Sequence, residues 1–307
     1  MARQRRAGLL RCLNGKTGVT MKAVNTHHVR ETAMKIVFLI TACVSILAVV
    51  LICVFLFANG IPTMHEIGFL KFLFGTTWAP NQNLYGIFPM IIASIVVTAG
   101  AIAIGVPAGL LCAIFLAHFC PGKLYKLLKP AAELLAGIPS IVYGFFGLVV
   151  IVPIMQRLVG GGGKNIITAS VMLGIMILPT IINVAESSLR AVPQSYYEGS
   201  LALGATHERS VFSATLPAAK SGILAGIILG VGRAVGETMA VVMVAGNQPI
   251  LPESLLSGVR TLTANIVLEM GYATDLHREA LIACGVVLFV FILLINLCFS
   301  ALKRRME

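Results

Sequence analysis

Arg233 and Glu237 interrupt a long apolar stretch, in the segment Gly232-Arg233-Ala-Val-Gly236-Glu237-Thr238. An Arg near the centre of a membrane-spanning helix costs at least ~2.5 kcal/mol, so such a residue normally faces a bundle interior or a water-filled path. Its guanidinium is a planar fork of donors that suits an oxyanion. On a continuous helix, two residues four apart share one face. The spacing therefore predicts either a charged station on a path or a self-neutralising pair that holds helices together.

The carboxylate of Glu237 would give such a station a chemical preference. Hydrogen phosphate carries an O–H donor that a carboxylate accepts, whereas sulfate has no proton at neutral pH and meets only repulsion. Glu237 beside Arg233 therefore predicts selection of phosphate over sulfate. Thr238 follows directly and is included in the candidate path. Gly232 and Gly236 are also four apart, which predicts a close approach by another helix.

A second candidate segment is ELLAGIPSIVYGFFG, residues 133–147. Gly and Pro together weaken a helix, and irregular backbone persists in a membrane only where protein or a water-filled cavity covers it. One interpretation is close packing through Gly137, Gly144 and Gly147. The other is a bent helix that lines a pore and places Ser140 and Tyr143 near a substrate.

The elements that carry these residues are membrane spans. Hydrophobic residues make up 58% of the 307-residue chain and charged residues only 11%, against about 25% in soluble proteins. Six apolar segments reach the length of about 20 residues that a bilayer requires. They are continuously apolar, without the period of two of a barrel strand. The sequence predicts an all-α polytopic bundle with spans at 36–57, 85–116, 132–156, 166–189, 219–246 and 279–302.

The charge distribution predicts the orientation. With both termini in the cytoplasm, seventeen Lys and Arg residues lie on the cytoplasmic side and five on the opposite side, as the positive-inside rule expects. The net charge of +11 is thus a topology signal and requires no nucleic-acid partner. Residues 1–35 are expected to form a basic cytoplasmic tail, disordered over 1–30, and 303–307 a cytoplasmic C-terminus. Trp78 and Tyr85, near the point where the chain re-enters the membrane after the loop 58–84, are expected at the membrane interface.

The cytoplasmic loop 190–218 is long for a link between two spans. Its sequence predicts two short helices joined by a turn at Gly204. Such an element either protrudes and contacts a partner protein, or it is an amphipathic hairpin that lies on the lipid headgroups.

This loop resembles the EAA loop of ABC importer permeases, whose pattern is Glu-Ala-Ala, three residues, Gly, nine residues, then Ile-x-Leu-Pro. Glu198, Gly204, Leu216 and Pro217 match that pattern at its spacing. Three positions depart from it by a small residue: Gly199, Ser200 and Ala214. The resemblance implies the ABC type I importer permease fold, with this loop docked in a cleft of an ATP-binding subunit.

The segments IPSIVYGFFGL and GRAVGETMAV further resemble the PstC-type permease subunits of phosphate-specific ABC transporters, over about residues 36–302. This resemblance implies a multi-pass protein of the bacterial inner membrane that moves inorganic phosphate. It implies as partners a PstA-type permease, two PstB-type ATPases and a periplasmic phosphate-binding protein. ATP and magnesium would be bound by the ATPases, with no cofactor on this chain. Arg233 and Glu237 fall on the charged pair of the family's phosphate path.

Three other functions compete with this one. An ABC permease for another oxyanion, molybdate or sulfate, would share the loop but not the GRAVGETMAV context. An ion-coupled secondary transporter should show inverted repeats, and none is evident. A membrane enzyme needs a nucleophile, base or metal cluster, yet the six His residues are scattered without ligand spacing. The run of glycines at 160–163 lacks the Lys-Ser/Thr pair of a phosphate-binding loop. We expect no catalytic and no metal site.

Overall fold

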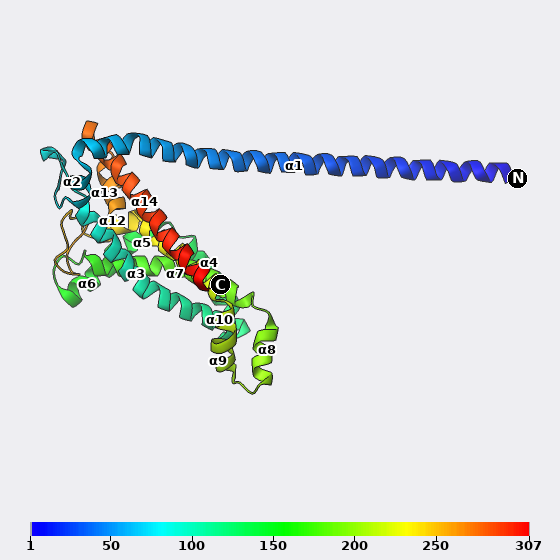
Figure 1. Ribbon diagram of the computed structural model, residues 1–307. Coiled ribbons are helices and arrows are strands. Elements are labelled where there is room, and N and C mark those ends of the chain that lie inside the picture. Colours follow the sequence, from blue (N-terminus) through cyan, green and yellow to red (C-terminus); the bar gives the residue numbers. More distant parts are fainter. Residues whose placement is uncertain (1, 307) are drawn as a thin grey trace. The chain divides into compact units, whose positions relative to one another are not determined.

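The computed structural model describes the backbone of residues 2–306 and the side chains of residues 30–301 (Figure 1). The chain forms two compact units, one up to Leu56 and one from Phe57 onward. The helices are α1 Ala2–Ile67, α2 Phe69–Phe74, α3 Phe88–Ile114, α4 Gly122–Ala136, α5 Ser140–Phe146, α6 Val152–Val159, α7 Ile166–Arg190, α8 Gln194–Ala202, α9 His207–Ser210, α10 Leu216–Ala218, α11 Lys220–Gly236, α12 Met239–Val244, α13 Leu262–Glu269 and α14 Asp275–Met306. Short π-helical turns cover Phe115–Phe119, Gly147–Ile151 and Val211–Thr215, a 3-10 turn covers Pro80–Gln82, and strands β1 Trp78–Ala79 and β2 Leu84–Tyr85 form an antiparallel hairpin.

Five helical stretches among the described residues are long and apolar enough to cross a membrane: Arg30–Ile67, Phe88–Phe119, Ser140–Val159, Ile166–Arg190 and Asp275–Ala301. A sixth is possible if His207–Ala218 and Lys220–Gly236, which meet at 70°, act as one broken span. The predicted all-α membrane bundle is confirmed.

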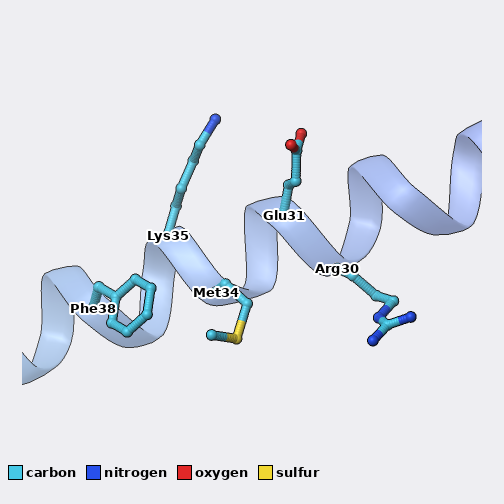
Figure 2. Close-up of a pocket in the computed structure, with 5 residues that line it drawn as sticks. All are labelled: Arg30, Glu31, Met34, Lys35 and Phe38. Carbon is cyan, nitrogen blue, oxygen red and sulfur yellow. The ribbon is translucent and has the colours of Figure 1, made fainter.

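The first helix differs from its expected form. The helix α1 runs without interruption from Ala2 to Ile67, through the predicted disordered tail and ten residues into the predicted loop 58–84. Once the apolar run has nucleated a helix, each further residue adds a hydrogen bond at little cost, so the flanks continue it. At the start of the apolar run, Arg30, Glu31, Met34, Lys35 and Phe38 line a shallow hollow (Figure 2). All five lie on one helix, so no second element closes a site there.

The core of the second unit is α7, which lies beside α3 and α11 (Figure 1). In its most apolar window, 67% of the residues are buried. Glycines let the neighbours approach closely: a Cβ at Gly105 or Gly109 of α3 would lie within 2.9 Å of Ile177 or Ile181 on α7. Small residues are the usual means of close packing between membrane helices. Because α7 is held this tightly, it is the fixed frame for the broken helices around it.

Two predicted spans are interrupted along their length. The expected span 132–156 is divided at residues 137–139 between α4 and α5, and the expected span 219–246 is divided at residues 237–238 between α11 and α12. In the first break, Pro139 has no N–H and its ring disfavours a helical conformation at Ile138. In the second break, Glu237 is extended, with φ −72° and ψ 133°.

Candidate substrate path and coupling hairpin

Arg233 lies in the last turn of α11 and is half-buried. Its guanidinium forms no hydrogen bond or salt bridge with any residue whose side chain the structure describes. Nothing lies within 4 Å of a Cβ built at Gly232 or Gly236, on either side of it. Among the described residues, no helix therefore makes the predicted close approach at these glycines. The result is an unpaired cation beside open space.

Glu237 does not share a helical face with Arg233, because α11 ends at Gly236 and Glu237 turns away in extended backbone. The predicted shared face is thus wrong. The Oε1 atom of Glu237 instead accepts a hydrogen bond from the N–H of Ala240, at 3.0 Å, at the start of α12. Its carbonyl accepts from the Thr263 hydroxyl at 3.0 Å. Thr238 is half-buried in the break, with its Oγ1 3.4 Å from the carbonyl of Gly236.

Ser140 is the first residue of α5 and is half-buried, directly after the break at Pro139. Tyr143 is buried one turn further on, and its hydroxyl donates to the carbonyl of Leu135 on α4 at 2.8 Å. That bond ties the two sides of the break together.

The two breaks are brought together by packing of α5 on α12. A Cβ at Gly144 would lie 2.8 Å from the Cα of Ala240, and one at Gly147 would lie 2.9 Å from the sulfur of Met172 and from Val244. Close packing through these two glycines is as predicted, whereas Gly137 is exposed. The predicted path residues therefore gather where two interrupted helices meet.

The predicted helix–turn–helix in the loop 190–218 is present. Helices α8 and α9 project from one end of the bundle (Figure 1) and are joined at Gly204, whose φ is +86°. That left-handed conformation suits glycine, which has no Cβ to clash. Glu198 is exposed on α8, while Leu216 and Pro217 begin α10 beside the membrane helices.

Leu203, at the tip of this hairpin, was not singled out from the sequence. Its side chain is 91% exposed, the highest value among the large hydrophobic residues that are exposed in the described chain. An exposed apolar side chain thus stands at the projecting tip. The signal in the sequence that could have indicated this exposed side chain was a Leu directly before the turn residue Gly204.

A buried ionic cluster near the C-terminal end of α7 was also missed. The Glu186 carboxylate, 2% exposed, accepts from Tyr125 Oη at 2.9 Å, from Lys129 Nζ at 3.0 Å and from Arg190 Nε. Burial raises the pKa of the Tyr125 phenol, and its bond to Glu186 adds to that shift, so the phenol stays a donor. The cluster fixes α4 against α7.

A second missed cluster lies at the opposite end of the bundle. The Glu269 carboxylate accepts from Arg260 Nη1 at 2.5 Å and from Trp78 Nε1 at 2.8 Å, and contacts His277 Nε2 at 2.8 Å. Trp78 is 6% exposed and Tyr85 is 4% exposed. Both rings are thus packed inside the protein, and their predicted depth at the membrane interface stays a prediction. They join the hairpin of β1 and β2 to α13.

Comparison with known proteins decides the family. Residues 105–307 match the family described as binding-protein-dependent transport system inner membrane component. The chain belongs to this family. It is thus a multi-pass membrane permease of the inner membrane, and the resemblance to ABC importer permeases is confirmed.

Individual relatives of this permease support the narrower resemblance. A probable ABC transporter permease protein, YqgH, of Bacillus subtilis is 38% identical over 86% of this chain and 90% of its own length. The phosphate transport system permease protein PstC of Mesorhizobium japonicum is 35% identical, over 83% and 85%. PstC of Xylella fastidiosa is 37% identical, over 72% and 74%.

Solved structures confirm the fold of the permease. A chain of the MetNI methionine ABC transporter, in an inward-facing conformation, matches with a TM-score of 0.60 at 22% identity, over 75% of this chain and all of that one. A chain of a bacterial alginate ABC transporter matches with a TM-score of 0.57 at 14% identity, over 85% and 93%. At these identities the likeness supports the fold alone.

Proposed function

We propose that this permease is the subunit through which an ATP-driven importer carries inorganic phosphate into the cytoplasm. The observation that carries the proposal is Arg233, an unpaired guanidinium at a helix break, in a chain whose relatives include PstC permeases of phosphate transport systems. A cation with no partner in a low-dielectric region is favoured when an anion approaches it. Phosphate is an anion that matches the fork of Arg.

The path in this proposal runs past Arg233 between the two broken helices. Open space on the Gly232 and Gly236 side of α11 gives an anion access to the guanidinium. Ser140 and Thr238 supply hydroxyl donors from the two breaks. Tyr143 serves mainly to hold the α4–α5 break in place, since its hydroxyl already donates to Leu135.

The energy for transport comes from partner subunits in this proposal. The hairpin of α8 and α9 docks on an ATP-binding subunit through Leu203 and the exposed face that carries Glu198. The full assembly contains this chain, a PstA-type permease, two PstB-type ATPases that bind ATP and magnesium, and a periplasmic phosphate-binding protein. The N- and C-termini lie in the cytoplasm, and this chain performs no hydrolysis itself.

Substitution of Arg233 tests the proposal. Phosphate uptake through the assembled transporter should fall by about tenfold to a hundredfold in Arg233→Gln, because a charged hydrogen bond contributes about 1.5–3 kcal/mol. Arg233→Lys should retain part of the uptake, since it keeps the charge but not the fork. Arg157→Gln, the same change at an exposed position on α6, is the control.

Undiminished uptake in Arg233→Gln, with normal protein levels, would contradict the role of Arg233. Competition by molybdate or sulfate distinguishes the alternative cargo. If the transporter imports one of these oxyanions, adding that oxyanion should abolish phosphate uptake. If it imports phosphate, phosphate uptake should persist.

A further inference from the structure

The break between α11 and α12 lies in a sequence that does not require one. Residues 237–241 read Glu-Thr-Met-Ala-Val and contain neither Pro nor Gly. Glu, Met and Ala are good helix formers, and Gly236 just before them is still helical. A continuous helix would also bring Glu237 onto the face of Arg233, where the opposite charges attract. The local sequence therefore favours continuation, and contacts from elsewhere must hold the break.

The backbone groups that would continue the helix are bonded to side chains. In a continuous helix the N–H of Ala240 would donate to the carbonyl of Gly236. Here it donates to Glu237 Oε1, at 3.0 Å. The carbonyl of Glu237 would accept from the N–H of Val241. Here that carbonyl accepts from the Thr263 hydroxyl, at 3.0 Å. Side-chain bonds thus replace two backbone bonds that would carry α11 into α12.

The two replacement bonds differ in origin. The bond between Glu237 and Ala240 is local, since the two residues are three apart in the chain. The bond from Thr263 comes from a different helix, 26 residues further on. A local bond of a break is lost as soon as the helix continues, so it cannot by itself prevent continuation. Thr263 is therefore the member of this set that holds the break from outside.

The Thr263 hydroxyl is itself held in place. Thr263 is 7% exposed and is the second residue of α13. The N–H of Leu262, directly before it, donates to Ser94 Oγ on α3, at 3.1 Å. Thr261 Oγ1 lies 3.1 Å from Thr263 Oγ1. Because Thr263 uses its one proton on the carbonyl in the break, Thr261 is the donor in this pair. The start of α13 is thus fixed to α3 and presents Thr263 to the break.

We propose that Thr263 is a positioning residue of the substrate path, which holds Glu237 out of α11 and so keeps Arg233 free for an anion. Without this hydroxyl, the buried carbonyl of Glu237 would lose its donor and would be satisfied by continuation of the helix. The Glu237 carboxylate would then pair with Arg233 and compete with the anion. This inference rests on the proposed function, because it takes Arg233 as the group that meets phosphate.

Phosphate uptake by the assembled transporter tests the proposal. Thr263→Val is isosteric and removes the hydroxyl. We expect the KM for phosphate to rise by about tenfold with little change in the maximal rate, because only molecules with a free Arg233 bind phosphate. Thr263→Ser keeps the hydroxyl and should keep the parental KM. The control is Thr215→Val, since Thr215 is 2% exposed and its Oγ1 has no hydrogen-bond partner in the described chain.

A double variant separates positioning from general support of the fold. Glu237→Gln cannot form an ion pair with Arg233, even on a continuous helix. Added to Thr263→Val, it should return the KM to the value of Glu237→Gln alone. A role of Thr263 in stability alone predicts no such recovery. A KM that stays raised in the double variant, or a parental KM in Thr263→Val, would overturn the proposal.

Hydrogen–deuterium exchange without phosphate tests the hold on the break independently of the cargo. In the full chain, Thr263→Val should slow exchange over residues 237–241, because their N–H groups gain helical partners. Thr263→Ser and Thr215→Val should leave it unchanged. Unchanged exchange in Thr263→Val would overturn the proposal. Slowed exchange together with undiminished uptake in Arg233→Gln would contradict the proposed function, and would still support the hold of Thr263 on the break.

Discussion

At the scale of single residues, Glu237 is expected to have two roles, a helix cap and a selective charge, and one substitution separates them. Its carboxylate caps α12 through Ala240, and in the proposed path its charge also opposes sulfate. Glu237→Gln keeps an acceptor for the cap and removes only the charge. We expect the preference for phosphate over sulfate to fall by about tenfold, since a like charge no longer opposes sulfate. Uptake of phosphate with sulfate as competitor measures this.

Glu253→Gln, an exposed loop carboxylate, is the control for Glu237→Gln. An unchanged preference in Glu237→Gln would restrict this residue to its cap.

Glu269 holds together the end of the second unit formed by the β1–β2 hairpin, α13 and the start of α14. Glu269→Ala leaves Arg260, whose side chain is 15% exposed, without its ion-pair partner. We expect a loss of about 3–5 kcal/mol in stability, as for other broken buried ion pairs. Trp78 is the one Trp of the chain and donates to Glu269, so its fluorescence should shift to longer wavelength as water enters.

Glu66→Ala, the same substitution at an exposed position, should leave both the melting temperature and the Trp78 emission unchanged. A Glu269→Ala variant with parental emission and stability would show that the cluster contributes little.

The sequence located the charged residues of the path but not the arrangement of Arg233 and Glu237. A spacing of four residues means a shared face only while the helix is continuous, and the break at Glu237 depends on tertiary bonds, such as the one from Thr263. The clusters around Glu186 and Glu269 could not be predicted from the sequence for a related reason. Their members are far apart in the chain, for example 191 residues between Trp78 and Glu269.

At the scale of elements, the coupling hairpin was the most predictable part, because its signal is local. Turn glycine, flanking helices and closing Leu-Pro all lie within 190–218. The break at 137–139 was one of the two interpretations of that segment, since Gly137 and Pro139 act on their own backbone. The packing of α5 against α12 was not predictable, because it joins segments about a hundred residues apart.

The exposed tip of the hairpin leads to a prediction about assembly. Leu203→Ser should reduce co-purification of the ATP-binding subunit by about tenfold, because burying a Leu side chain contributes about 1.5–3 kcal/mol. The stability of the isolated chain should not change, since Leu203 is 91% exposed. Leu158→Ser, at a 74% exposed position on α6, is the matched control. Full recovery of the ATPase with Leu203→Ser would place the docking surface elsewhere.

At the scale of the whole molecule, the number of crossings decides where the chain ends. Helix α11 has 17 residues, about 25 Å, which is slightly short of a bilayer core of about 30 Å. The break and α12 extend it, whereas the 70° bend places residues 207–218 at an angle to it. If α11 and α12 cross together, the chain has six spans and both termini lie on one side. If they do not, the termini lie on opposite sides.

Cysteine labelling in a Cys-free background distinguishes these topologies. With six crossings and cytoplasmic termini, an impermeant maleimide should label Gly162→Cys and Glu253→Cys in intact cells, and Leu203→Cys only after permeabilisation. Gly162 and Glu253 are exposed, and a Cβ at Gly162 meets nothing within 4 Å. The decisive position is Glu253, because it follows α12. Labelling of Glu253→Cys only in opened cells would mean that α11 turns back, and Arg233 would then lie beside a re-entrant loop and not on a continuous path.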